Sequence, residues 1–133
     1  MGYEIVPHTA DLAVKVWGKD LSELFQSALD GYRFLLIGDK TIKASTVQCF
    51  SVEAQDLESL LVRFCNRLIF LFDTEYFLPV TAKLEIDNYH LEAEVAGSTS
   101  REDIRHCVKA ATYHNLSIES LENFLTATIV FDD

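Results

Sequence analysis

The stretch VTAKLEIDNYHLEAEVA, residues 80–96, decides the fold class because it contains two strands and the turn that joins them. Apolar and polar side chains alternate through both halves, a pattern typical of strands that bury one face. The apolar positions are Val80, Ala82, Leu84 and Ile86 in the first half and Leu91, Ala93 and Val95 in the second. Between them, IDNYHL at 86–91 is a hairpin turn signal. The stretch therefore predicts an antiparallel strand pair.

The same alternation predicts strands elsewhere in the chain. Leu12, Val14 and Val16 form the apolar face of a segment near the N-terminus, and residues 45–54 contribute another strand. Near the C-terminus, AATYHNLSI (110–118) and FLTATIVFD (124–132) are interpreted as a second strand pair, separated by the polar stretch 119–123. Strands therefore outnumber helices.

Two segments carry the spacing of amphipathic helices. In the first, apolar residues recur at the i, i+3, i+4, i+7 positions of one face, namely Leu21, Leu24, Phe25, Ala28, Leu29 and Tyr32. Asp20 and Glu23 resemble a capping box at its start, and Gly38 can end it. The second helix follows Asp56 as the N-cap and carries a wider apolar stripe: Leu57, Leu60, Leu61, Phe64, Cys65, Leu68 and Phe72.

These elements predict an α+β fold, a two-layer sandwich in which a mostly antiparallel sheet packs on two amphipathic helices. The order is strand, strand, helix, strand, helix and then two hairpins, with a short helix expected at 101–107. Residues 1–133 are interpreted as a single domain, since domains of this length are common. The Gly-rich patterns of phosphate-binding loops are absent from the sequence.

Charge restricts the classes of partner. The chain has 21 acidic and 11 basic residues, a formal net charge of −10. Because nucleic-acid binding depends on Lys and Arg that neutralise phosphates, we expect no stable direct binding of RNA or DNA. A basic protein or a cation fits this surface better. Apolar stretches are too short for a bilayer span and no secretory signal is visible, so we expect a cytoplasmic protein without a membrane partner.

Three cysteines, Cys49, Cys65 and Cys107, are odd in number and widely separated. Neither a disulfide framework nor a zinc site is indicated. We expect buried free thiols, and assign no catalytic cysteine.

Acidic residues at strand ends are the candidates for a cation site. Alternation places Asp11 and Asp132 off the core faces of their strands, and Asp133, with its α-carboxylate, adds acid beside Asp132. If the strand ends meet, a hard divalent cation such as Ca²⁺ or Mg²⁺ would relieve the repulsion between carboxylates. In the competing interpretation, Asp11 caps a turn and Asp132 is a solvated strand end.

Other side chains leave further alternatives open. Lys109 lies opposite Val108 and Ala110 in the expected strand, where it is either a solvated lysine or the partner of an acid. His8, near Asp11, together with His106 and His114 could form a general base and its orienting acid. A stand-alone metal-dependent hydrolase that uses His8, Asp11 and His114 is therefore one alternative. No nucleophile motif accompanies them. A chaperone-like binding module that uses the acidic surface is the other alternative.

Four segments, in this order and over nearly the full length, resemble the archease family: YEIVPHTADLAVKVWGKDLSELFQSA, AQDLESLLVRFCNRLIFLFDTE, LEAEVAG and VKAATYHNL. The HTAD box at 8–11 and the KAATYH box at 109–114 are specific in combination. The resemblance implies a small acidic accessory protein of the RtcB-type RNA ligase, which acts in tRNA splicing and RNA repair by joining ends that carry a 2′,3′-cyclic phosphate or 3′-phosphate to 5′-hydroxyl ends.

The resemblance also assigns roles to individual residues. It implies that the protein is not an enzyme but promotes guanylylation of the ligase's active-site histidine and permits many turnovers. The family's functional residues fall on Asp11, Lys109 and Asp132. A divalent cation, calcium or magnesium, is expected on Asp11, Asp132 and Asp133. The family commonly ends in an acid followed by an aliphatic residue, whereas this chain ends in two acids, which leaves Asp132 and Asp133 as alternatives for the last ligand.

Overall fold

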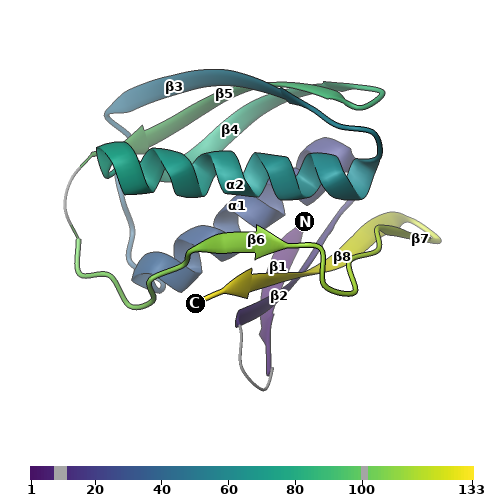
Figure 1. The fold of residues 1–133 in the computed structure, drawn as a ribbon, viewed down its shortest axis with the longest axis horizontal. Helices are drawn as coiled ribbons and strands as arrows, with labels where there is room; N and C mark the ends of the chain where they lie inside the picture. The colour runs from purple at the N-terminus through teal and green to yellow at the C-terminus, as the bar shows by residue number, and fades with distance from the viewer. Residues whose placement is uncertain (8–11, 100–101) are drawn as a thin grey trace.

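The computed structural model describes residues 1–7, 12–99 and 102–133, which contain two helices and eight strands (Figure 1). The elements follow one another as β1 (Gly2–Val6), β2 (Leu12–Gly18), α1 (Leu21–Ile37), β3 (Thr46–Glu53), α2 (Leu57–Glu75), β4 (Leu78–Asp87), β5 (His90–Ser98), β6 (Ala110–Thr112), β7 (Glu119–Leu121) and β8 (Phe124–Asp132). The predicted α+β class is confirmed, and so is the hairpin, formed by β4 and β5.

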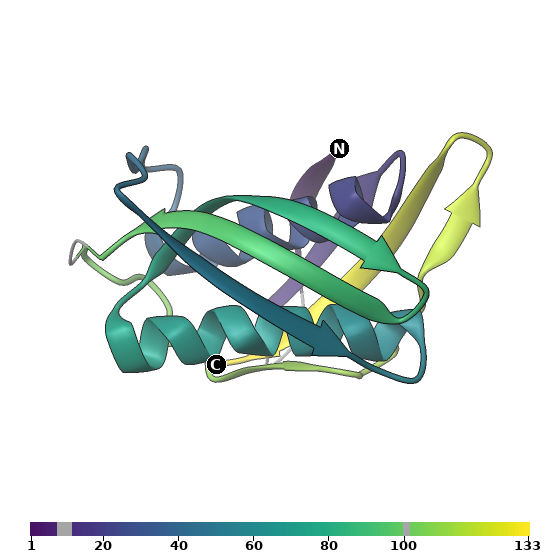
Figure 2. The same ribbon diagram turned by 90° about the horizontal axis from the view of Figure 1, so that it is seen from above.

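The strands form two antiparallel sheets, where the sequence suggested one. Strands β1, β2, β8 and β6 lie side by side in the first sheet, and β7 also pairs with β8. The second sheet has the order β3-β5-β4. Both helices lie between the sheets, with α1 packed on β2 and β4 and α2 packed on β6 and β3 (Figures 1 and 2). Each helix therefore buries two sides.

Both helix starts have the caps that the sequence predicts. The Asp20 carboxylate accepts a hydrogen bond from the Glu23 backbone N–H at 2.9 Å, and Asp56 accepts one from the Ser59 N–H at 2.7 Å. Such bonds satisfy backbone donors that the first helical turn leaves unpaired. At the end of α1, Gly38 adopts φ +72°, a conformation that favours glycine.

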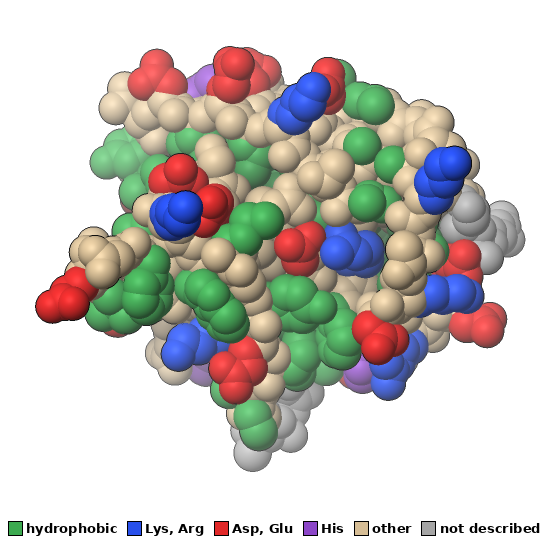
Figure 3. Space-filling view, turned by 180° about the vertical axis from the view of Figure 1, so that it is seen from behind, with side chains coloured by type: hydrophobic (Ala, Val, Ile, Leu, Met, Phe, Trp, Pro, Cys, Tyr) green, Lys and Arg blue, Asp and Glu red, His purple; other side chains and the backbone are tan. Residues whose placement is uncertain are grey.

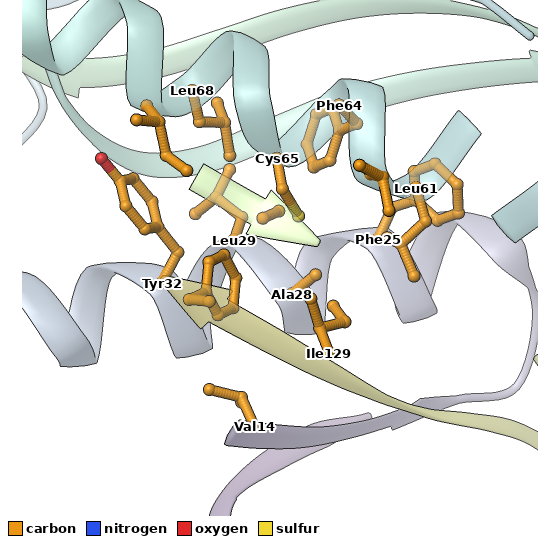
Figure 4. Packing of buried hydrophobic residues seen from close by; sticks show 14 of the residues in the cluster. Val14, Phe25, Ala28, Leu29, Tyr32, Leu61, Phe64, Cys65, Leu68 and Ile129 are labelled. Carbon is orange, nitrogen blue, oxygen red and sulfur yellow. The ribbon is translucent and has the colours of Figure 1, made fainter. Parts of the chain in front are cut away.

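The core lies where the apolar stripes of the two helices meet the inner faces of the sheets (Figure 4). The rings of Phe25 on α1 and Phe64 on α2 are 5.6 Å apart, and Tyr32 stacks on Phe131 of β8 at 6.1 Å. Leu61 and Phe64 are fully buried. The two predicted helix faces are thus confirmed as core faces.

Three local predictions in the C-terminal part are wrong. The stretch 119–123 is not only a connection, because Glu119–Leu121 forms β7 and pairs with the start of β8. Of the expected strand 110–118, only Ala110–Thr112 is a strand. No helix occurs among residues 102–107, the described part of the helix expected at 101–107. The hairpin of β7 and β8 projects from the body of the molecule (Figure 2), so β7 is exposed throughout and lacks the alternation that reveals a buried strand.

The prediction of buried cysteines holds for one residue of three. All three are free thiols, but only Cys65 is buried, and burial raises the pKa of its thiol to about 12. Cys49 is exposed because it faces outward from β3, and Cys107 is exposed in the segment before β6. Neither helix of the described chain is long and apolar enough to cross a membrane.

Candidate functional site

Lys109 and Asp132, two of the predicted site residues, lie side by side at one end of the first sheet. The Lys109 backbone N–H donates a hydrogen bond to the Asp132 carbonyl oxygen at 2.9 Å, and the next residue, Ala110, pairs with Asp132 across β6 and β8. Both side chains are exposed. In Figure 1 the C-terminal end of β8 lies next to the start of β6. A basic and an acidic residue, both exposed, are therefore backbone neighbours at this end of the sheet.

Asp132 is exposed, as predicted, but strand alternation is only part of the reason. Ala127, Ile129 and Phe131 of β8 are buried as expected, yet Val130, on the same side of the strand as Asp132, is buried too. Asp132 is exposed as the last residue of β8. Asp133, the next residue, is also exposed. The end of β8 therefore carries two solvent-accessible carboxylates in succession.

Lys109 is exposed for a reason other than the predicted one. The sequence interpretation took Val108 and Ala110 as the core face of a strand, but the core residue of β6 is Ala111, which is 5% exposed. Val108 is buried as well, so alternation does not run from residue 108 into the strand. Lys109 precedes the first residue of β6, and its side chain leaves the core before regular pairing begins.

Asn66 on α2 fixes β6 in place, a role that sequence reasoning missed. Its side-chain carbonyl accepts a hydrogen bond from the Ala111 N–H at 2.8 Å, and its amide group donates one to the Ala111 carbonyl at 3.3 Å. One side chain thus satisfies both backbone groups of the central residue of β6. In the sequence, Asn66 is visible only as a polar residue directly after Cys65 of the apolar stripe. Nothing in that position indicates which residue it would contact.

The charges of the site are not neutralised by one another within the described chain. Among residues 1–7, 12–99 and 102–133, no carboxylate lies within 4.0 Å of the Lys109 ammonium in an ion pair. The same residues contain no group of three or more His, Cys, Asp or Glu side chains that could hold a metal ion. Asp132 and Asp133 would therefore need further oxygen ligands to bind a cation.

Asp11 and His8 lie outside the described residues, so their predicted roles stay predictions. The residue that follows Asp11 in the sequence, Leu12, pairs with Phe131, which directly precedes Asp132. Of the other predicted histidines, His106 is half-buried and His114 is exposed. Neither belongs to a cluster of three potential ligands among the described side chains.

A largely apolar cavity of about 510 Å³ adjoins the site at Val108, the residue before Lys109. Its apolar walls come from the end of α2 and from the segment before β6, and its rim carries charged groups. The lining residues are Phe72, Asp73, Tyr76, Glu102, Ile104, Arg105, Cys107 and Val108. On the face seen from behind, acidic and basic side chains are interspersed with hydrophobic ones (Figure 3). The cavity is a surface on which an apolar group of a partner could pack.

Comparison with known proteins identifies a matching family and relatives within it. The model of the archease protein family matches residues 3–132. Protein archease of Archaeoglobus fulgidus is 30% identical over 136 residues, which covers 99% of each chain. Protein archease-like of Drosophila melanogaster is 42% identical over 97 residues, covering 69% of this chain and 58% of the fly protein.

Solved structures agree with the fold. A solution structure of a protein from Methanobacterium thermoautotrophicum, 28% identical, superposes with a TM-score of 0.86 and covers 99% of both chains. A Thermotoga maritima protein described as an archease, possible chaperone, is 23% identical, has a TM-score of 0.64 and covers 98% of this chain and 96% of that one. At that identity the second likeness concerns the fold alone.

Proposed function

Because the chain belongs to the archease protein family, we propose that it is an accessory protein of an RtcB-type RNA ligase. In this proposal it promotes guanylylation of the ligase's active-site histidine and so permits many turnovers in tRNA splicing or RNA repair. The ligase performs the chemistry, and this chain binds next to the reacting groups. The site of action is the cytoplasm.

The observation that carries the proposal is the juxtaposition of Lys109 and Asp132. The Lys109 N–H donates a hydrogen bond to the Asp132 carbonyl oxygen, with 2.9 Å between the two atoms, and both side chains are exposed. The two residues form no ion pair with each other, so both charges are available to a partner that carries a cation and an anionic group. A guanylylation site that uses a nucleotide phosphate and a divalent metal ion has this chemistry.

A cation site at the end of β8 would complete the arrangement. Asp132, Asp133 and Asp11 supply carboxylate oxygens, which are the ligands that Ca²⁺ and Mg²⁺ prefer. Asp132 and Asp133 fit this requirement because both are exposed, and Leu12, the residue after Asp11, pairs with Phe131 beside them. A bound cation would supply positive charge to phosphate oxygens or bridge to acids of the ligase. Lys109 would orient the same phosphate or acid from its side of the site.

The net charge of −10 fits a protein partner that binds RNA better than it fits RNA itself. A ligase that handles RNA carries a basic surface, which an acidic accessory protein can approach with favourable electrostatics. Direct binding of nucleic acid is not part of the proposal. The adjoining cavity at Val108 offers apolar contact area near the charged pair.

The test is a reconstituted reaction. RNA ends are incubated with the purified chain alone, with RtcB-type ligase and GTP, or with the chain, the ligase and GTP together, while guanylylated ligase and joined RNA are measured. We expect no change of RNA by the chain alone and more guanylylated ligase per unit time when both proteins are present. Cleavage or dephosphorylation of RNA by the chain alone would instead support a hydrolase. Equal guanylylation with and without the chain would contradict the proposal.

A further inference from the structure

A second concave surface lies between β3 and α2, the helix that Figure 1 shows in front. This groove has a volume of about 420 Å³. It is lined by the end of β3 and the middle of α2, namely Ser51, Val52, Glu53, Arg63, Asn66, Arg67 and Phe70. Beyond α2 lies β6, which Asn66 ties to the helix. Neither Lys109 nor Asp132 lines the groove.

One wall of the groove is a strand with a free edge. In the second sheet β3 pairs with β5 on one side only, so its other edge is not paired within the described chain. Unpaired N–H and C=O groups on an edge strand can pair with an added strand. Along β3, exposed residues alternate with half-buried ones, so no residue of this strand is fully buried.

The other wall carries two arginines in a chain that is otherwise rich in acid. Arg63 and Arg67 are one helical turn apart on α2, and neither makes an ion pair with a carboxylate among the described residues. The Arg67 guanidinium lies 5.1 Å from the centre of the Phe50 ring, which fixes its position. Glu53, the acid nearest in the lining, faces His90 at 3.7 Å instead. Neither arginine of the groove is therefore paired with a carboxylate within residues 1–7, 12–99 and 102–133.

An aromatic ring completes the helix wall. Phe70 is 57% exposed, because it lies on the same side of α2 as Arg63 and Arg67, at the spacing of successive turns. Large apolar side chains on a helix are normally buried, and one that is exposed beside an arginine pair offers contact area to a partner.

We propose that this groove binds an extended acidic segment of a partner protein, added as a strand to the free edge of β3. The carboxylates of the segment pair with Arg63 and Arg67, and an apolar side chain of the segment packs on Phe70. Main-chain hydrogen bonds to β3 supply affinity, and the arginines supply selectivity, as in other recognition modes that place a peptide between a strand and a helix. The inference goes beyond the proposed function because it does not use Lys109 or Asp132.

Protein is favoured over RNA as the occupant for electrostatic reasons. A nucleic-acid strand is bound through many cations that follow its backbone, whereas this groove has two arginines, with Glu53 in its lining. The rest of the chain, with a net charge of −10, repels a long polyanion. A short segment with two carboxylates needs only the two guanidinium groups, each of which can bind a carboxylate with two hydrogen bonds.

The experiment selects peptides from a random displayed library on the immobilised full chain and measures the affinity of the selected peptides in solution. We expect enrichment of Asp and Glu, and amide chemical-shift changes on β3 and α2. Arg63→Glu, and Arg63→Ala with Arg67→Ala, should each weaken binding by about threefold to tenfold. Lys83→Ala is the matched control, because Lys83 is an exposed cation on the far strand of the same sheet and its removal should change nothing.

Three outcomes would overturn the proposal. The first is a selected pool without acidic enrichment, and the second is binding that the Arg63 variants leave unchanged. The third is binding of oligouridylate to the same residues with higher affinity than the peptides, which would assign the groove to RNA. Circular dichroism of each variant excludes unfolding as the cause of a loss. Lys109→Ala and Asp132→Asn should bind the peptides as the parent does, so failure of the proposed function leaves this test intact.

Discussion

The backbone N–H of Lys109 and the carbonyl oxygen of Asp132 are joined by a hydrogen bond of 2.9 Å, which brings together two residues from segments that are distant in the sequence. Because this bond uses main-chain atoms, either side chain can be changed without breaking it. Function and folding can therefore be separated at this site by substitution.

Lys109→Ala should leave the melting temperature of the protein unchanged and remove most of its stimulation of ligase guanylylation. The side chain is exposed, so its loss creates no cavity. Lys83→Ala removes the same charge from an exposed site on β4 and should stimulate as the parent does. Full stimulation by the Lys109 variant would identify Lys109 as a solvated lysine.

Calcium or magnesium should raise the melting temperature of the parent, because a ligand that binds only the folded state stabilises it by mass action. Asp11→Asn and Asp132→Asn should each remove most of that increase. The double variant should reduce the increase in melting temperature little more than either single variant does, since both carboxylates would belong to one site. Asp39→Asn, at an exposed position outside the proposed site, is the control and should respond as the parent does. Unchanged responses in both single variants would mean that these acids do not share a cation.

Asn66→Ala should destabilise the fold by about 1–3 kcal/mol, since it leaves the N–H and C=O of Ala111 without partners against the helix. Faster hydrogen exchange of the Ala111 amide should accompany the loss, together with weaker stimulation of the ligase although Lys109 is intact. Asn66→Asp keeps an acceptor for the Ala111 N–H and should therefore lose less stability than Asn66→Ala. If Asn66→Ala exchanges at the parental rate, β6 is held by β8 alone.

Leu61→Ala and Phe64→Ala should each cost about 2–5 kcal/mol in free energy of unfolding, the usual cost of truncating a large buried side chain. Both side chains lie in the core and are 0% exposed to solvent. Phe70→Ala on the same helix is the matched control, because Phe70 is 57% exposed and should cost far less. Denaturant unfolding measures all three. Equal costs for Phe70 and Phe64 would contradict the assigned helix face.

His90 should make stability depend on pH. The hydrogen bond to Glu92, at 2.7 Å, raises the pKa of His90 above its ordinary value of 6.5, and the charges of Glu53 and Asp87 act in the same direction. The protonated form is thus favoured in the folded state. This contribution is fully present below the unfolded value and is lost as the pH rises through the raised folded pKa.

The measurement is the melting temperature as a function of pH, with an NMR titration of the His90 ring. The parent should lose stability as the pH rises from 6.5, and His90→Gln should show a flatter profile. A ring that titrates at or below 6.5 in the folded protein would contradict the expected sign.

Elements whose patterns are local could be predicted from the sequence. The stripes of α1 and α2 and the alternation of β4 and β5 each lie within one segment, and the structure confirms them. Partition into two sheets could not be predicted, because it depends on which distant strands pair. Strand β7 was missed because all of its residues are exposed, so no burial pattern marks it.

For the site, the same distinction applies at the level of single residues. The exposure of Asp132 was predicted from alternation in β8, but the same alternation placed Val130 off the core, and Val130 is buried. The partnership of Asn66 with Ala111 joins two segments whose sequences give no indication of each other. The role of Asp11 stays a prediction from the family resemblance, since it lies outside the described residues.

The pairing of β2 with β8 has a consequence for how the chain acquires its structure during synthesis. Residues Leu12–Gly18 pair with Leu125–Phe131, whereas β3, β4 and β5 find all their partners between residues 46 and 98. On the ribosome the three-stranded sheet can therefore assemble while β2 still lacks its second neighbour. Strand β8 both joins β2 to the rest of the first sheet and brings Asp132 to Lys109, so these two residues cannot meet before β8 has been synthesised.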